Sequence, residues 1–371
     1  MMSTYNIEAM RKKLNDTWAA TIIDIADKDF QNTQFVGDIL FPRVGYDKDV
    51  YEIGNDNQYV APMGYTNRLE SIPMNDKTST LNRKTLTLPT KAKKDQLPID
   101  KLKWVLMAET ISAKQWAELK MSGAKILTNL YRELQLRNEI EVWHYLTYGK
   151  VFTQDGVQYA NFVPYGIDQT DYGTGICFHS RENWISAGGT INASATVIQD
   201  FLDAVAAMTS GDYDAPTTVW MNTTTYNCIY GNTALNTQTL NMYNPIQLKG
   251  FLGQDIDWAK KGIKISTLTP VGLNLVILDS TYRAASDTAT KVKFIPDYYV
   301  VLTPSVVGNR FVAPNIFNQN SDRWAITYGS STITNSNDVP GMFFEVGETS
   351  FPIPSNYDMK SHYVMYVKHT A

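Results

Sequence analysis

Few residues of this sequence stand at spacings that support catalysis. Two pairs of aspartates, each separated by one residue, could act as a general acid and base on a sugar or could bind a metal ion. Such pairs are more often solvated loop residues. The pairs are Asp212/Asp214 and Asp255/Asp257. We expect neither pair to be catalytic, and a cytosolic glycosidase-like enzyme that uses one of them is the alternative from a different class of protein.

Other motifs for catalysis and ligand binding are incomplete. Cys177 and His179 lie two positions apart with no other Cys or His near them in the sequence, whereas zinc needs three or four ligands. His144 lies beside Trp143 in a helical segment, where a structural histidine is more common than a general base. No phosphate-binding P-loop is present. We therefore predict a protein that is not an enzyme and that has no catalytic, cofactor-binding or metal-binding residues.

The composition favours a protein that buries much of its surface against other copies of itself. Charged residues make up 19% of the 371 residues, against about 25% in an average globular protein. The sequence also holds 22 Tyr, 8 Trp and 13 Met. Few charges with many Tyr, Trp and Met are typical of the buried parts of protein–protein interfaces. A surface made polar by Asn and Thr is the alternative explanation.

Several classes of protein are disfavoured. The two cysteines cannot build a disulfide framework, and the formal net charge is only −4. No window approaches the roughly 20 apolar residues that a membrane span requires. The first residues lack the apolar run of a signal peptide. We therefore expect neither a secreted protein nor a membrane protein, and we expect assembly in a reducing cytoplasm.

A basic, extended segment lies between residues 46 and 98. It lacks helical periodicity, and residues 49–53 and 81–88 have the character of strands, which predicts a two-stranded excursion. Two strands alone are marginally stable in water, so something outside the subunit should hold them. Residues 77–103 contain eight basic and two acidic residues, whereas residues 1–60 contain ten acidic and six basic residues.

These opposite charges predict that the excursion lies over a neighbouring subunit. The basic residues at this contact would be Arg83, Lys84, Lys91, Lys93 and Lys94. Their acidic partners, on the arm of another copy, would be Asp24, Asp27, Asp29 and Asp38. A nucleic acid or the solvent is the alternative environment of the basic residues.

The strongest local pattern predicts a helix from about residue 112 to 147. Apolar residues recur there at three- and four-residue steps, as on one face of a helix. They include Trp116, Leu119, Ile126, Leu127, Leu130 and Leu134. Thirty-six residues would form a rod of about 54 Å. On a polar face, Glu133, Arg137 and Glu141 are spaced by four residues and can pair.

Beyond residue 149 the pattern is α+β. A second helix is expected over 194–208, with Ile198, Phe201, Leu202 and Val205 on one face. Asn222 is expected to cap a short helix. Strands are expected at 217–221, 273–278, 294–302, 323–328 and 363–368.

The order of these parts resembles that of the major capsid proteins of tailed phages with the Hong Kong 97 type fold, most closely the lambda-type branch. Residues 35–44 (FVGDILFPRV) are similar to the entry into the E-loop of that family, and residues 137–143 (RNEIEVW) to the end of its spine helix. Residues 184–186 (WIS), 198–205 (IQDFLDAV) and 215–222 (APTTVWMN) are similar to the entry into its A-domain.

The resemblance implies an α+β, Hong Kong 97 type capsid fold with a defined division of the chain. An N-terminal arm would span 1–45, and an extended E-loop hairpin 46–98. A P-domain with the spine helix at about 112–147 would span 99–190, and an A-domain 191–338. Residues 339–371 would return to the P-domain, which the strand 363–368 would complete.

The resemblance also implies a function and partners. Such a protein self-assembles as hexamers and pentamers into the icosahedral head shell of the virion, around the double-stranded DNA of a tailed phage. The DNA would contact the inner face non-specifically. A scaffolding protein, a portal and decoration proteins would be partners, without a membrane or a cofactor. An encapsulin-like nanocompartment shell protein is the alternative with the same fold.

Overall fold

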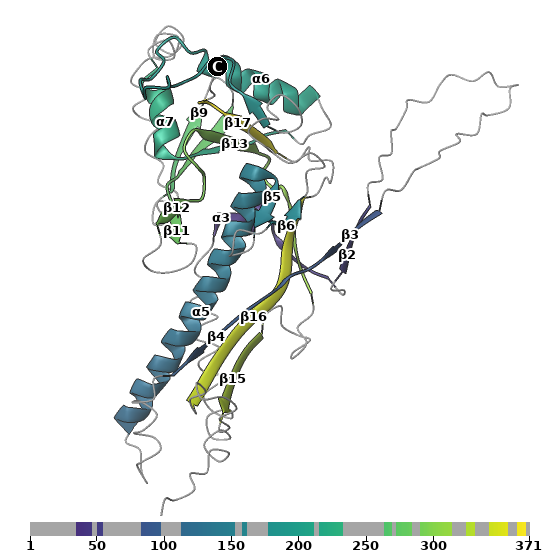
Figure 1. Cartoon of the computed structure of the whole chain (residues 1–371), viewed down its shortest axis with the longest axis vertical. Helices are drawn as coiled ribbons and strands as arrows, with labels where there is room; N and C mark the ends of the chain where they lie inside the picture. The colour runs from purple at the N-terminus through teal and green to yellow at the C-terminus, as the bar shows by residue number, and fades with distance from the viewer. Residues whose placement is uncertain are drawn as a thin grey trace, which may run out of the picture.

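The computed structural model of this chain describes thirteen stretches of sequence. These are residues 35–46, 50–54, 83–97, 113–152, 158–161, 177–210, 215–232, 263–268, 272–283, 290–313, 324–330, 341–354 and 362–368. In Figure 1 they form an elongated body on one long helix, α5 (Ala113–Tyr148). A six-stranded sheet lies at one end of this helix, and a five-stranded sheet runs along its side.

Helix α5 confirms the predicted long helix, with bounds that differ by one residue at each end. It ends where Gly149 adopts a φ of 61° and donates its N–H to the carbonyl of Tyr145 at 2.8 Å. A left-handed residue at this position favours glycine. On the predicted apolar face, Leu127, Leu130 and Leu134 are buried. The side chains of Trp116 and Leu119 lie outside the described part of the structure.

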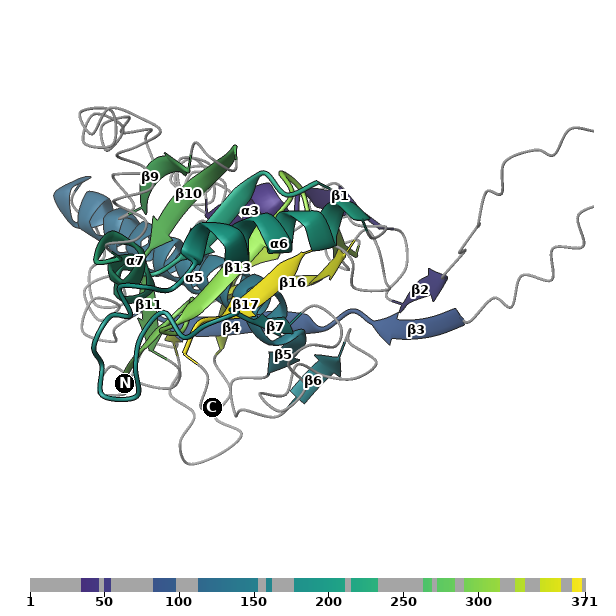
Figure 2. The same ribbon diagram turned by 90° about the horizontal axis from the view of Figure 1, so that it is seen from above.

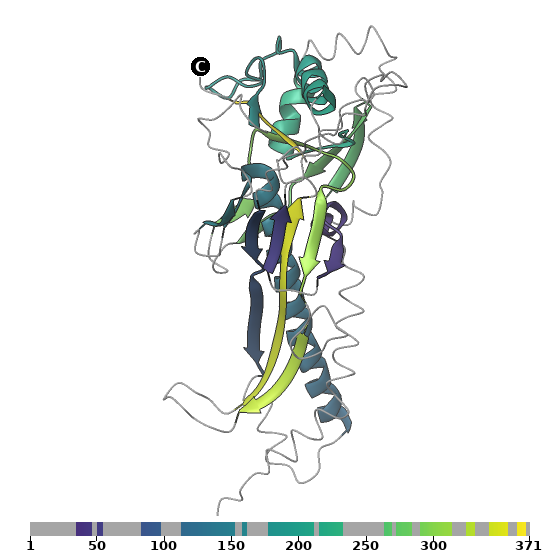
Figure 3. The same ribbon diagram turned by 90° about the vertical axis from the view of Figure 1, so that its right-hand side faces the viewer.

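The five-stranded sheet is organised around one long strand, β16, which α5 follows for much of its length (Figure 3). The first part of β16 pairs with β4 and β15, and its last part pairs with β14, which also pairs with β1. The bounds are β1 Arg43–Gly45, β4 Thr90–Gln96, β14 Gly308–Val312, β15 Trp324–Ser330 and β16 Gly341–Pro354. A Cβ at Gly308 would lie 2.2 Å from the carbonyl oxygen of Ile353, so glycine permits the close pairing of β14 with β16.

The six-stranded sheet is covered on both faces. Its order is β7 (Cys177–His179), β17 (Tyr363–Tyr366), β13 (Tyr299–Thr303), β8 (Thr218–Met221), β10 (Leu273–Leu278) and β9 (Ile263–Leu268). Helices α6 (Val197–Ser210) and α7 (Thr223–Tyr230) pack on one face, and Figure 2 shows α6 across the sheet. The end of α5 and helix α3 (Val36–Leu40) contribute to the core on the other face. Burial on both faces explains the nearly continuous apolar runs of β8, β10 and β13.

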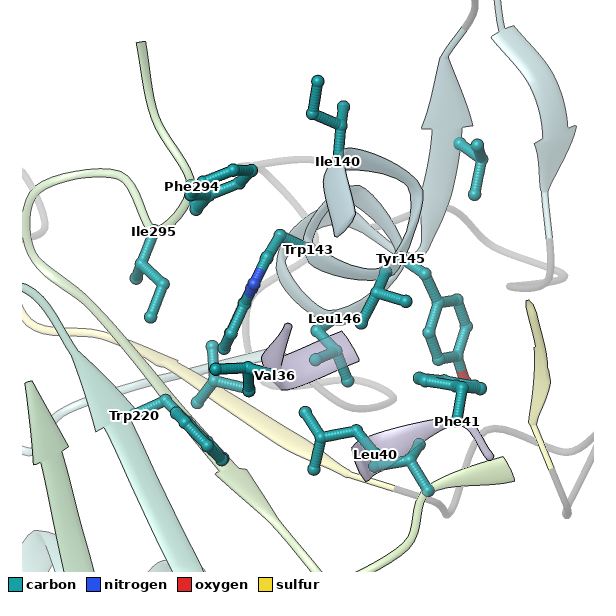
Figure 4. Close-up of a cluster of buried hydrophobic side chains, with 14 of the residues drawn as sticks. Val36, Leu40, Phe41, Ile140, Trp143, Tyr145, Leu146, Trp220, Phe294 and Ile295 are labelled. Atoms are coloured by element: carbon teal, nitrogen blue, oxygen red, sulfur yellow. The ribbon is translucent and has the colours of Figure 1, made fainter. Parts of the chain in front are cut away.

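Alternate residues of β8 show how this sheet divides the core. Val219 and Met221 pack with α6, whereas Trp220 points to the other face and meets Trp143 of α5. The two indole rings lie edge to face with centroids 5.5 Å apart (Figure 4). Phe41 completes this core beside Tyr145 of α5.

Three two-stranded sheets accompany the main body. The pair β2 (Val50–Gly54) and β3 (Arg83–Thr87) projects sideways from it (Figures 1 and 2). This antiparallel pair confirms the predicted two-stranded excursion for these residues. The other pairs are β5 (Lys150–Phe152) with β6 (Gln158–Asn161), and β11 (Thr281–Arg283) with β12 (Lys291–Lys293).

Local expectations were right at α7 and partly wrong elsewhere. Asn222 caps α7, since its side chain accepts the N–H of Thr225 at 2.9 Å. Leu202 was expected on the apolar face of α6, but it is 40% exposed. The expected strand 294–302 begins only at residue 299. Pro296 and the positive φ of 70° at Tyr298 interrupt the extended backbone before it.

The strand pairings place strands that are far apart in the sequence in the same sheet. Strands β14 and β15 pair with β16 in the five-stranded sheet. Strand β17 pairs with β13 and β7 in the six-stranded sheet. The expected division into an N-terminal arm, an E-loop, a P-domain and an A-domain stays a prediction.

We predict that Leu130→Ala lowers the free energy of unfolding by about 2–5 kcal/mol, because it removes a fully packed side chain from the middle of α5. Leu130 is 3% exposed. Met121 of the same helix is 75% exposed and provides the control: Met121→Ala should change the free energy by less than about 0.5 kcal/mol. Urea unfolding of dissociated subunits measures both, and equal effects would contradict the assigned face.

Candidate functional site

The second half of α5 carries polar side chains into the protein interior. Asn138, Glu139 and Glu141 are each at most 4% exposed. Nε of Arg137 lies 3.4 Å from Oε1 of Glu141, as the predicted four-residue spacing requires. Glu141 itself is buried and not part of a solvated helix face. Its charge must therefore be balanced by groups from the sheet that α5 covers.

Arg310 of β14 is the buried cation that meets this segment. Its side chain is 0% exposed. Nη2 donates to the backbone oxygen of Asn138 at 2.8 Å, and Nη1 donates to Oδ1 of Asn138 at 3.2 Å and to Oε2 of Glu141 at 3.3 Å. A guanidinium remains charged in proteins, so these acceptors compensate for the loss of water around it.

Lys91 and Glu348 bring the neighbouring strands into the same group. Nζ of Lys91 donates to Oδ1 of Asn138 at 2.6 Å and to Oε2 of Glu141 at 2.8 Å. Glu348 accepts a hydrogen bond from Nδ2 of Asn138 at 3.1 Å. It also binds Arg43 and the hydroxyl of Ser350. We call this group the charge cluster: Arg43, Lys91, Asn138, Glu141, Arg310, Glu348 and Ser350. It joins α5 to β1, β4, β14 and β16.

Burial shifts the pKa values of Lys91 and Glu348 in the charge cluster. The excess of positive over negative side chains in the cluster also shifts them. Burial lowers the pKa of Lys91 to about 8, and the nearby charge of Arg310 acts in the same direction, against the attraction of Glu141. Burial alone would raise the pKa of Glu348, but Arg43, Lys91 and Arg310 lower it to about 2. Glu348 is therefore ionised at neutral pH, whereas Lys91 can lose its proton far more readily than an exposed lysine.

A second buried carboxyl group, that of Glu139, holds α3 against α5. Its Oε2 accepts the N–H of Gly37 at 2.7 Å, and its Oε1 accepts Nε1–H of Trp143 at 2.7 Å. A Cβ at position 37 would lie 2.6 Å from Oε2 of Glu139, so glycine allows this approach. Burial raises the pKa of Glu139 to about 7.

Three of the lysines predicted to contact a neighbouring subunit lie against their own subunit. Lys91 belongs to the charge cluster, where its side chain is 11% exposed, and its contact with a second copy stays a prediction. Nζ of Lys93 lies 2.6 Å from Oε2 of Glu133, and both side chains are largely exposed. Nζ of Lys94 lies 5.3 Å from the ring centroid of Phe343. Contact of Lys93 and Lys94 with a second copy stays a prediction.

The other predicted contact residues are less fully described. Arg83 and Lys84 lie on β3, and their side chains are outside the described part. Asp38 lies in α3 and is half-buried. Asp24, Asp27 and Asp29 fall outside the described residues. Contact between these acidic and basic residues therefore stays a prediction.

The residues considered for catalysis form no site in the described ranges. Cys177 and His179 lie on β7, and Asp212, Asp214, Asp255 and Asp257 fall outside the description. Among the described residues, no group of three or more His, Cys, Asp and Glu could hold a metal ion. In the same part of the chain, no helix has both the length and the apolar character needed to cross a membrane.

The sequence analysis did not identify the charge cluster. For two of its members, however, the alternation of buried and exposed residues along a strand indicates a buried position. Arg310 is two residues from the buried Val312, and Glu348 lies two residues from the buried Val346 and Ser350. A period of two places each charge on the inner face of its strand. A charged residue on the buried face of a strand predicts a buried partner.

Comparison with known proteins supports a relation at the level of the fold. No protein-family model and no curated protein matches the sequence. A solved structure assigned as the capsid protein of a prophage of E. coli CFT073 matches with a TM-score of 0.60 at 11% identity, over 94% of this chain and 99% of that chain.

Two further solved structures match less closely. A phage-related protein from Bordetella bronchiseptica RB50 has a TM-score of 0.47 at 11% identity, over 93% of this chain and 96% of that one. The capsid of a native GTA particle has a TM-score of 0.43 at 13% identity, over 91% and 92%. The match to the prophage protein over nearly the whole of both chains confirms the predicted fold class. This chain has the α+β fold of a phage capsid protein, as its resemblance to the Hong Kong 97 type implied.

Proposed function

We propose that this chain is a major capsid protein that self-assembles as hexamers and pentamers into the icosahedral head shell of a tailed phage. The observation that carries the proposal is the fold shared with a prophage capsid protein over 94% of this chain. The shell would enclose double-stranded DNA, which contacts the inner face non-specifically. Membership of the lambda-type branch, and the scaffolding, portal and decoration proteins as partners, belong to the same proposal.

The shape of the subunit supports self-assembly. The ribbon of β2 and β3 projects from the body (Figure 2) and has no third strand among the described residues. Two strands gain stability when another surface covers them. A neighbouring subunit in a shell would supply that surface. In this arrangement Arg83 and Lys84 of β3 lie at the contact, and acidic residues of the neighbour's arm, such as Asp24, Asp27 and Asp29, are their partners.

Electron microscopy and sedimentation of the expressed chain test the proposal. We expect closed shells, or rings of five and six subunits that close on addition of a scaffolding protein. Nucleic acid inside particles from infected or induced cells supports the phage function, whereas an enzyme as cargo supports the encapsulin-like alternative. A chain that stays monomeric in all these conditions contradicts both shell functions.

Charge reversal on β3 tests the ribbon contact. We predict that Arg83→Glu with Lys84→Glu leaves the subunit folded but weakens assembly, which circular dichroism and sedimentation would show. Each exposed ion pair contributes only about 0–1 kcal/mol, but a shell repeats it at every contact. Wild-type assembly should also weaken near 1 M salt, where the screening length is about 3 Å.

A double reversal on another hairpin provides the matched control. Arg283 and Lys291 are exposed on β11 and β12. Arg283→Glu with Lys291→Glu changes the net charge equally, so it should leave assembly intact if the effect belongs to β3. Normal shells from the Arg83/Lys84 variant would show that these residues face solvent or DNA.

A further inference from the structure

The charge cluster contains more cations than carboxylates. Its charged side chains are at most 20% exposed, and they are the cations Arg43, Lys91 and Arg310 and the carboxylates Glu141 and Glu348. A buried charge without a partner of opposite sign is strongly unfavourable. The cluster is therefore short of one negative charge.

The charged residues described next to the cluster do not supply this charge. Arg137 adds a further cation, with its Nε 3.4 Å from Oε1 of Glu141. Glu139 lies near Arg310, but burial raises its pKa to about 7, so this carboxyl group is only partly ionised at neutral pH. Lys91, with a pKa of about 8, is still mostly protonated there. The excess of positive charge therefore persists at neutral pH.

The place where β1 lies beside β14 combines two of the cations with an unused donor. Arg43 and Arg310 are register partners in this parallel pair, so their side chains lie on the same face of the sheet. The terminal nitrogens of Arg310 donate to Asn138 and Glu141. Nε of Arg310 is buried and has no hydrogen-bond partner among the described residues. Buried N–H groups almost always have an acceptor, so this one indicates a further ligand.

We propose that the charge cluster binds one small inorganic anion, such as chloride, at the Nε–H of Arg310. A water molecule would satisfy this N–H but not the missing charge, whereas an anion supplies both the acceptor and the charge. The ion would enter past Arg43, whose side chain is 20% exposed. Because Arg310 is 0% exposed, a halide fits this position better than a phosphate or an organic anion.

A bound anion would strengthen the joint between α5 and the strands β1, β4, β14 and β16. A ligand that binds only the folded state stabilises that state by mass action. Salt would then act in two opposite ways: it screens exposed ion pairs between subunits, whereas chloride supports the fold of each subunit. The site lies within one chain, so it depends neither on shell assembly nor on the proposed function.

The ionisation of Lys91 should control the affinity for the anion. Lys91 faces Glu141 of α5, Arg310 of β14 and Glu348 of β16. Above its pKa of about 8 this lysine becomes neutral, and the remaining charges of the cluster balance without an anion. Glu139, which ionises above a pH of about 7, acts in the same direction. We therefore expect tighter binding at about pH 6.5 than at about pH 9.5.

Urea unfolding of dissociated subunits, with chloride replacing gluconate at constant sodium concentration, tests the proposal. Gluconate keeps the ionic strength equal and is too large for the site. Above the dissociation constant, each tenfold increase in chloride should lower the unfolding constant of the wild type about tenfold, as one site requires. The effect should be smaller at about pH 9.5. An unfolding constant that does not depend on the anion would show that water satisfies Nε of Arg310, and would overturn the proposal.

Two variants on β4 separate the site from general charge effects. Lys91→Met removes the excess charge and should largely abolish the chloride dependence. Lys93→Met changes the net charge equally, but Lys93 is 64% exposed and pairs with Glu133, so this variant should keep the wild-type dependence. A chloride dependence that is the same in both variants would contradict a site in the charge cluster.

A measurement on the wild type covers the case in which Lys91→Met does not fold. Crystals grown with bromide in place of chloride should show an anomalous peak within hydrogen-bond distance of Nε of Arg310. Bromide found only at other positions would overturn the assignment. Shell formation is scored separately by microscopy, so each proposal can fail without the other.

Discussion

Arg310→Ala should lower the free energy of unfolding by about 3–5 kcal/mol, because it removes one member of a buried ion-pair network and deprives buried oxygens of Asn138 and Glu141 of a charged donor. Arg310 is 0% exposed and donates to Asn138 and Glu141 through both of its terminal nitrogens. Without it, Glu141 keeps Lys91 and the half-buried Arg137 as partners, but the carbonyl and amide oxygens of Asn138 lose a buried donor. Urea unfolding of dissociated subunits measures the loss.

An exposed ion pair between the same helix, α5, and the strand β4 is the control. Lys93 of β4 and Glu133 of α5 form an ion pair with 64% and 48% of their side chains exposed. Lys93→Ala should therefore cost at most about 1 kcal/mol. The loss of stability caused by Arg310→Lys should lie between the losses caused by Arg310→Ala and Lys93→Ala. Lysine keeps the positive charge but lacks the planar guanidinium group that reaches two acceptors. Equal effects of Arg310→Ala and Lys93→Ala would contradict the energetic role of burial in the charge cluster.

The features that could be predicted from the sequence are those that depend on neighbours along the chain. Leu127, Leu130 and Leu134 mark one face of α5 by their spacing, and Gly149 ends this helix. Asn222 caps α7 through the N–H of Thr225, three residues away. Such signals are complete within a few residues, so a single sequence contains them.

The charge cluster lacks this kind of local signal. Lys91 is 47 residues from Asn138, whereas Glu348 is 210 and Arg310 is 172 residues from it. In the sequence these charged residues lie far apart. Lys91 is there simply one of the basic residues within 77–103. Only the pairing of β4 and β14 with β16 brings them under α5. Register and strand order, which one sequence does not specify, therefore decide which charges are internal.

The second large expected effect is a steep loss of stability below about pH 4.5. His362 is fully buried beside Tyr145, and burial lowers its pKa to about 3. In the unfolded chain a histidine titrates near pH 6.5, so below this pH the unfolded state binds a proton that the folded state does not. The stability from a neutral His362 is complete above pH 6.5 and is lost as the pH falls toward 3, by about 5 kcal/mol in total. His144, whose pKa burial lowers to about 4, acts in the same direction.

Between pH 7 and 4.5, the titration of Glu139 opposes this loss of folding stability. Because burial raises its pKa to about 7, the folded state binds a proton between pH 7 and 4.5 that the unfolded state does not. Folding is therefore favoured as the pH falls through this window, by about 3 kcal/mol. Below pH 4.5 the gain is complete. Glu348, whose pKa the neighbouring cations lower to about 2, then begins to lose its own contribution of about 3 kcal/mol. The free energy of unfolding should accordingly decline slowly from pH 6.5 to 4.5 and steeply below.

Glu139→Gln distinguishes these contributions, because it removes the titration. Its single amide oxygen replaces one of the two acceptors of Gly37 N–H and Trp143 Nε1–H, so the variant loses stability at every pH, and the test rests on the shape of the pH profile. In this variant nothing offsets His362, so the steep decline should begin near pH 6.5. His362→Phe keeps an aromatic ring beside Tyr145 and should reduce the loss below pH 4.5. Urea unfolding of dissociated subunits across pH 3–8 measures all three proteins. If the Glu139→Gln profile runs parallel to that of the wild type, Glu139 is already ionised at pH 6, and the contact between α3 and α5 does not depend on its proton.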